Sequence, residues 1–95
     1  MRFQWDADKD RANLGKHGVD FATAALVFAD PHIVLGEDRT GGDGEQRWHA
    51  LGLAGGLAPL LIVVHVYREA NDGEEIIRII SARKASERES RAYFQ

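Results

Sequence analysis

The segment from Leu57 to Arg68 constrains the fold more than any other part of the chain, because it is apolar on both sides of a two-residue repeat. Successive side chains of a strand point to opposite faces of a sheet. Leu60, Ile62, Val64 and Val66 would therefore share one face, and Leu61, Val63, His65 and Tyr67 the other. A strand that is apolar on both faces is typical of the centre of a sheet, so we predict a central strand here.

Further segments with strand character surround this one, and turn residues separate them. Glycine clusters lie at 40–44 and 54–56, and Asn71-Asp72-Gly73 is a sequence that favours a tight hairpin. Such short connections predict an antiparallel sheet over residues 32–83. Its other strands are expected at 32–37, 45–53 and 74–83, with a short edge strand at 3–5.

Three helices are predicted from capping residues and from the spacing of apolar residues. Asp6 can cap a first helix that ends near His17, where Gly18 suits the left-handed conformation that commonly terminates helices. Asp20 can cap a second helix, whose apolar stripe of Phe21, Ala24, Ala25 and Phe28 ends before Asp30-Pro31. Ser86 and Glu89 have the spacing of a capping box that opens a last helix. The expected class is α+β, with two N-terminal helices and one C-terminal helix packed on an antiparallel sheet of four to five strands.

Length and composition favour one small protein domain over residues 1–95. There is no cysteine, which excludes disulfides and thiol chemistry. The N-terminus is polar and acidic within six residues, unlike a secretory signal, and the longest apolar run is too short to span a bilayer. We therefore expect a cytoplasmic protein without membrane contacts.

The charges are unevenly distributed. The net charge is −3, which argues mildly against nucleic-acid binding, because neutralising phosphates supplies most of that affinity. Residues 78–95, however, carry a local charge of +3 from Arg78, Arg83, Lys84, Arg88 and Arg91 against Glu87 and Glu89. This basic end can bind a short nucleic-acid strand, although a solvated helix face explains the charges equally well.

Metal and cofactor sites are not indicated. The four histidines, at positions 17, 32, 49 and 65, lack the spacing of a helical zinc site. The glycine clusters lie between predicted strands rather than before a helix, so they do not form a phosphate-binding loop of the nucleotide-binding kind. We expect neither a metal nor another cofactor.

The stretch from Ile76 to Ala85 is the most informative for chemistry. Strict alternation would place Arg78 on the same face as Ile76 and Ile80. A guanidinium among apolar neighbours either pairs with a carboxylate or is kept for an anion. Arg83 lies where this strand meets the last helix, a position that favours a cleft, although an Arg–Glu pair joining helix to sheet is an equally good explanation.

Several pieces of the chain, in order, resemble the BrnT family of type II toxins. They are Phe3-Gln4-Trp5-Asp6, Lys9, Asn13-Leu14, Lys16 to Phe21, Ala24, Val27-Phe28, Asp30-Pro31, Glu45, Arg47, Leu51-Gly52, Ile77 to Arg83, Ala85, Glu89 and Tyr93. The resemblance implies a RelE-like fold and an endoribonuclease that cleaves RNA and inhibits translation. It also implies neutralisation by a BrnA-type ribbon-helix-helix antitoxin, through which DNA would be contacted only indirectly.

Metal-independent RNA cleavage needs a base, a cation that stabilises charge on the phosphate, and an acid for the leaving 5′-oxygen. We assign the cationic role to Arg83 and then Arg78. Glu89 and His17 are the first choices for proton transfer, followed by His49 and His65. Tyr93 can stack on a base or bind phosphate, and the residues expected to bind RNA are Lys16, Arg47, Lys84, Arg88 and Arg91.

Each of these residues also has a structural interpretation. Glu89 can complete the capping box, Tyr93 can anchor the last helix, and His17 can interact with the negative end of its helix. His65, in the most apolar strand, is better explained as a hydrogen-bonded core residue. The family pattern has Glu-Arg where this chain has Glu89-Ser90. The alternative function is therefore a weakened toxin homologue that acts as an interaction module or co-repressor with a DNA-binding antitoxin.

Overall fold

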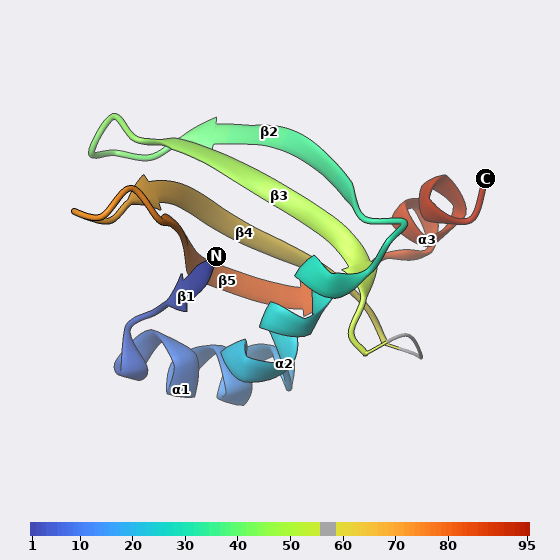
Figure 1. Cartoon of the computed structure of the whole chain (residues 1–95). Coiled ribbons are helices and arrows are strands. Elements are labelled where there is room, and N and C mark those ends of the chain that lie inside the picture. The colour runs from blue at the N-terminus through green and yellow to red at the C-terminus, as the bar shows by residue number, and fades with distance from the viewer. Residues whose placement is uncertain (56–58) are drawn as a thin grey trace.

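A computed structural model describes residues 1–55 and 59–95, in which five strands form one sheet in the order β1-β5-β4-β3-β2 (Figure 1). Helices α1 and α2 lie against one face of this sheet, and α3 lies at the end of the sheet opposite the β2–β3 and β4–β5 turns (Figure 1). The elements are β1 (Arg2–Gln4), α1 (Ala7–His17), α2 (Phe21–Ala25), the 3-10 helix η1 (Leu26–Ala29), β2 (Val34–Thr40), β3 (Gln46–Leu53), β4 (Leu60–Glu69), β5 (Glu75–Lys84) and α3 (Glu87–Tyr93).

The predicted α+β architecture is confirmed, with β4 at the centre of the sheet. The predicted start of this strand, at Leu57, lies outside the described residues, and the strand runs from Leu60 to Glu69. Strand β2 begins later than predicted, at Val34, because the Asp30 side chain accepts the His32 N–H and the Asp30 carbonyl accepts the Ile33 N–H, which holds 30–33 in a turn.

The prediction of an antiparallel sheet is confirmed for β2 to β5 but is wrong for the edge strand β1. Strands β2 to β5 form an antiparallel meander, but β1 pairs parallel to β5, with Phe3 opposite Ile77. A parallel neighbour requires a long crossover connection. Here the intervening helices and the strands β2, β3 and β4 provide that connection. The first strand of the chain, β1, therefore pairs with the last strand, β5, at the edge of the sheet.

The caps and ends of the helices follow the sequence closely. The Asp6 carboxylate accepts the N–H groups of Asp8 and Lys9, and Gly18 ends α1 with φ of 71°. Ser86 and Glu89 form the predicted capping box of α3. The second helix departs from the prediction because it tightens into η1 after Ala25, which is common in the last turn before a proline-induced stop.

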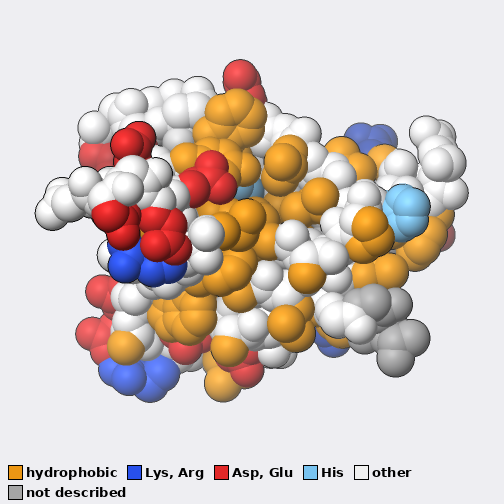
Figure 2. Space-filling view, in the orientation of Figure 1, with side chains coloured by type: hydrophobic (Ala, Val, Ile, Leu, Met, Phe, Trp, Pro, Cys, Tyr) orange, Lys and Arg blue, Asp and Glu red, His pale blue; other side chains and the backbone are white. Residues whose placement is uncertain are grey.

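The core lies between the sheet and the helices α1, α2 and η1. It is formed by buried apolar side chains from both layers: Val19, Phe21, Ala24, Val27, Ala50, Leu61, Val63, Ile77, Ile79 and Ala82. A row of aromatic rings extends this core along the sheet, from Phe3 through Phe28 and His65 to Tyr67. Figure 2 shows apolar side chains across the middle of this view and acidic side chains at the end where the hairpin turns lie.

A bulge in β5 decides which side chains reach the other face, which we call the open face because α1 and α2 do not cover it. Val64 pairs with Ser81 and His65 with Ile79, so Ile80 is the extra residue. Without the bulge, alternation would put Arg78 and Arg83 on opposite faces. With it, Arg78 lies opposite Val66 and Arg83 opposite Ile62, and both arginines face the open side.

Asn13 joins α1 to β5 at a point where β1 has already ended. Its side-chain amide donates to the carbonyls of Val19 and Ala82, both at 2.8 Å, and its oxygen accepts the Ala82 N–H at 3.1 Å. The side chain thus takes the place of a neighbouring strand for Ala82. Asn13 is only 7% exposed, so water cannot readily replace it.

We therefore expect Asn13→Ala to be strongly destabilising. A buried polar group left without a partner costs about 1–3 kcal/mol, and the substitution leaves three such backbone groups. The melting temperature should fall by at least about 10 °C. Arg11→Ala, an exposed change on the same helix, should leave it nearly unchanged, and an equally stable Asn13→Ala protein would contradict the strand-like role of Asn13.

Candidate active site

The open face carries a hollow of about 600 Å³ next to α3. Its floor is aliphatic and its rim carries ionisable groups. The residues that line it are His17, Val34, Asp38, His49, Leu51, Ile62, Val64, Ser81, Ala82, Arg83, Glu89 and Ala92. They come from α1, all four antiparallel strands and α3, so only the folded chain brings them together. An apolar concavity with a few convergent polar groups is the usual form of a small-ligand or active site.

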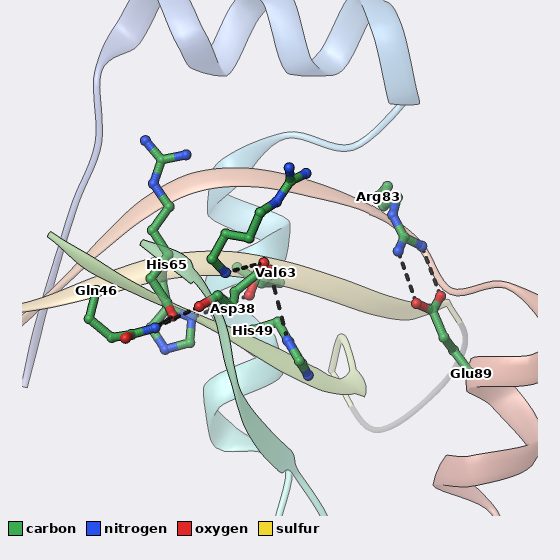
Figure 3. Close-up of polar contacts among 9 residues, drawn as sticks. Asp38, Gln46, His49, Val63, His65, Arg83 and Glu89 are labelled. Atoms are coloured by element: carbon green, nitrogen blue, oxygen red, sulfur yellow. Dashed lines mark hydrogen bonds and ion pairs between the residues drawn. The ribbon is translucent and has the colours of Figure 1, made fainter. Parts of the chain in front are cut away.

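Arg83 and Glu89 form a two-point ion pair across this rim. The guanidinium nitrogens Nη1 and Nη2 donate to Oε1 and Oε2 of Glu89 at 2.8 and 2.9 Å (Figure 3). The same carboxylate accepts the Ser86 N–H at 2.7 Å as part of the capping box. The structural interpretations of both residues are thus confirmed, because the pair joins the end of β5 to the first turn of α3.

The pairing also settles the charge of Glu89. Hydrogen bonds from Arg83, aided by the N–H of Ser86, lower the pKa of Glu89 to about 2. The carboxyl group therefore carries no proton at neutral pH and cannot serve as a general acid there. Its geometry suits a positioning residue, which fixes the direction of the Arg83 guanidinium toward the hollow.

A second polar pair lies on β2 and β3. The Nδ1 atom of His49 is 3.8 Å from Oδ2 of Asp38 (Figure 3). Gly36, the residue paired with His49 across the two strands, allows this arrangement. A Cβ at Gly36 would lie 2.6 Å from His49 Nε2, so any residue other than glycine would clash with the imidazole where it lies over β2. A carboxylate beside one ring nitrogen orients an imidazole for proton transfer through the other nitrogen.

His17 brings a second imidazole to the same hollow. It is the last residue of α1, and Gly18 turns the chain directly after it. The hollow therefore contains two imidazoles, an arginine fork fixed by a carboxylate, and an aliphatic floor. These are the group types that acid–base chemistry on an anionic substrate requires.

The other predicted catalytic residues lie elsewhere. Arg78 donates to Oε1 of Gln4 at 3.0 Å, so its partner is a neutral amide, and it does not line the hollow beside α3. Tyr93 donates from its hydroxyl to Oδ2 of Asp30, a buried carboxylate that also accepts the Leu53 N–H. The structural interpretation of Tyr93 is confirmed, because this bond anchors α3 to the turn before β2.

The residues expected to bind RNA are scattered. Arg47 lines a second hollow that adjoins the first. The remaining four are exposed and line neither hollow: Lys16, Lys84, Arg88 and Arg91. Arg91 also pairs with Glu87 at 3.5 Å on the surface of α3.

The other histidines are not part of this site. His65 is fully buried, its Nδ1 lies 3.2 Å from the Val63 carbonyl, and burial lowers its pKa. This confirms it as a hydrogen-bonded core residue. His32 is exposed in the turn before β2. Within the ranges 1–55 and 59–95, no three His, Asp or Glu side chains are grouped closely enough to hold a metal ion.

We expect Tyr93→Phe to loosen α3 without unfolding the sheet. Loss of the hydroxyl leaves the Asp30 carboxylate to the backbone N–H groups of His32 and Leu53. Helix α3, which carries Glu89, should then exchange its amide hydrogens faster. The rate of the reaction carried out at the hollow should fall by less than the roughly 10²-fold expected for losing a charge-stabilising group. Unchanged amide hydrogen exchange in residues 87–93 would contradict the anchoring role of Tyr93.

Sequence reasoning missed Asp38 and Gly36 altogether and ranked His49 below His17 and Glu89. Both missed residues lie on β2, in a strand whose start was misplaced by two residues. Gly36 lies within the predicted strand 32–37, but Asp38 lies beyond its end, because β2 continues to Thr40. Their partner in β3 is fixed by the strand register, which the sequence did not reveal.

Comparison with protein families gives a match over residues 5–89 to a family described as the ribonuclease toxin, BrnT, of a type II toxin–antitoxin system. The matched range includes every residue that lines the hollow except Ala92. Comparison with curated proteins gives no match. In the described part of the chain, no helix is both long and apolar enough to cross a membrane.

Proposed function

Because the chain belongs to the BrnT family of ribonuclease toxins of type II toxin–antitoxin systems, we propose that it cleaves RNA in the hollow beside α3. The observation that carries this proposal is the joint placement of Arg83, His49 and His17 around one apolar floor. A RelE-like assignment of the fold belongs to the same proposal, as do a cytoplasmic location and inhibition of translation through loss of RNA.

The proposed reaction is an attack of a ribose 2′-oxygen on the adjacent phosphorus. One imidazole takes the 2′-hydroxyl proton, and the bond from phosphorus to the 5′-oxygen breaks as the new oxygen–phosphorus bond forms. The other imidazole returns a proton to the leaving 5′-oxygen, which leaves a 2′,3′-cyclic phosphate. Arg83, directed by Glu89, stabilises the charge on the phosphoryl oxygens with its planar fork.

The aliphatic floor gives the hollow a second role. Val34, Leu51 and Ile62 offer an apolar surface on which a nucleobase or ribose can rest. Apolar surroundings also exclude water and strengthen the interaction of Arg83 with a phosphate. In this scheme the protein supplies acid, base and cation from its own side chains, so we propose that cleavage needs no metal ion.

The direct test is to incubate the purified chain with single-stranded RNA in the presence of EDTA. We expect cleavage products that end in a cyclic phosphate, and growth arrest when the chain is expressed alone. Intact RNA together with normal growth would contradict the proposed nuclease. If that protein still bound an antitoxin, the result would favour the alternative function of a non-catalytic interaction module.

We further propose that the partner is a BrnA-type antitoxin that covers the open face and α3. This region combines the basic side chains of residues 78–95 with exposed apolar side chains, among them Val34 at 46% and Phe94 at 68% exposure. Mixing the two proteins should slow amide hydrogen exchange in residues 78–95. Protection confined to α1, on the other side of the sheet, would contradict this placement.

A further inference from the structure

A second hollow, of about 370 Å³, adjoins the first at the β2–β3 hairpin. It is lined by Asp38, Arg39, Thr40, Gly41, Gly42, Arg47, Val64, Ile80 and Ser81. Three of these residues, Asp38, Val64 and Ser81, also line the hollow beside α3. The two hollows are therefore neighbouring parts of one groove along the open face.

The two arginines of this second hollow differ from most others in the protein. Five arginines pair with carboxylates: Arg2, Arg11, Arg68, Arg83 and Arg91. Within residues 1–55 and 59–95, by contrast, neither Arg39 nor Arg47 forms an ion pair. A guanidinium whose charge is not neutralised by the protein is well suited to bind an external anion.

The hairpin loop leaves room for the Arg47 fork. A Cβ at Gly41 would lie 3.0 Å from Nε and 3.1 Å from Nη2 of Arg47, so the guanidinium lies close against the backbone of the loop. The same position is 2.8 Å from Asp43 Oδ1, whose carboxylate accepts the Glu45 N–H at 2.9 Å. Asp38, the carboxylate that lines this second hollow, accepts the backbone N–H of Arg39 at 2.7 Å and lies beside His49.

The strand register gives the distance between the two cationic positions. Arg83 lies opposite Ile62, whereas Arg47 directly precedes Trp48, which lies opposite His65. Arg47 is thus displaced from Arg83 by about four residues of β4, or roughly 13 Å at the rise of a strand. This offset runs along the groove, and a single-stranded RNA, which carries one phosphate per nucleotide, can place separate phosphates at the two positions.

We propose that Arg39 and Arg47 form a second phosphate-binding subsite, which holds the backbone of a single-stranded RNA away from the phosphate at Arg83. This inference rests on the proposed function, and it adds the requirement that the substrate spans the groove. Short substrates that reach only Arg83 would bind weakly. Chains of several nucleotides would gain affinity from the second subsite at Arg39 and Arg47.

The test compares two uncleavable probes, uridine monophosphate and a fluorescent six-nucleotide oligodeoxyuridylate. The double variant Arg39→Ala/Arg47→Ala should weaken binding of the six-nucleotide probe by about tenfold or more and leave binding of the monophosphate unchanged. Each lost phosphate contact should also reduce the salt dependence of binding, with a slope change of about 0.7 in a log–log plot. Lys9→Ala/Arg11→Ala, which removes two positive charges from exposed positions of α1 on the other side of the sheet, is the matched control.

The proposal is overturned if the double variant binds the six-nucleotide probe with wild-type affinity and salt dependence. It is also overturned if the wild-type chain binds that probe no more tightly than the monophosphate, or if the double variant loses both probes equally. Failure of the proposed nuclease has a different signature, in which wild-type protein leaves RNA intact and Arg83→Ala does not change binding of the monophosphate.

Discussion

Arg83→Ala is expected to reduce RNA cleavage by about 10²–10³-fold, the usual effect of losing one well-placed charge-stabilising group. Arg83 directs its fork into the hollow beside α3, and its only carboxylate partner in the described residues is Glu89. A reduction of this size should relieve growth arrest when the chain is expressed alone. The measurements are the cleavage rate of a defined RNA and the growth of cells that express the variant.

The fold should survive this substitution. The Arg83 side chain is 45% exposed, and ion pairs at exposed positions contribute only about 0–1 kcal/mol. Glu89 keeps its capping bond to the Ser86 N–H. The melting temperature of Arg83→Ala should therefore fall by no more than about 4–8 °C from the wild-type value.

Two matched variants sharpen the Arg83 test. Arg83→Lys keeps the charge but loses the two-point geometry, so its activity should lie between those of wild type and Arg83→Ala. Arg88→Ala removes an exposed arginine from α3 that lines neither hollow and should remain active. An inactive Arg83→Ala protein that melts far below wild type would mean that Arg83 acts as a structural link between β5 and α3, and the cation would have to be sought elsewhere.

His49→Ala is expected to lower cleavage by about 10²–10⁴-fold, the range typical of general acid–base groups. His49 is the imidazole with a carboxylate neighbour, Asp38, and its side chain is 37% exposed at the rim of the hollow. Stability should change little, because the ring is not part of the core. His32→Ala, an exposed histidine outside the site, is the matched control and should keep full activity.

The pH profile distinguishes a catalytic His49 from a merely structural one. Two imidazoles in opposite proton-transfer roles give a bell-shaped dependence of kcat/KM on pH, and removal of one of them should abolish one limb. Asp38→Asn should reduce activity less than His49→Ala, since it affects only the orientation of the ring. Gly36→Ala should resemble His49→Ala, because its Cβ would displace the imidazole. A His49→Ala protein that retains both limbs of the profile would contradict the assignment.

Much of the secondary structure could be predicted because its causes are local. Asp6, Asp20 and Ser86 cap the helices that follow them, and Gly18 takes the left-handed conformation that ends α1. Apolar residues on both faces are typical of a central strand, and β4 lies at the centre of the sheet. Each of these features depends on residues within a few positions of one another, or on the composition of a single segment.

The site itself depended on contacts between distant segments. Local sequence was enough to place Arg83 at a strand end and to begin a helix at Ser86 and Glu89. The pairing of distant strands, by contrast, creates the bulge at Ile80 that turns Arg83 to the open face. It also brings Asp38 and Gly36 of β2 to His49. Only tertiary structure, too, places Asn13 against Ala82, 69 residues away. The physical reason is that a one-residue shift in strand pairing reverses every side chain that follows it, and that shift is fixed by packing across the whole sheet rather than by the residues beside it.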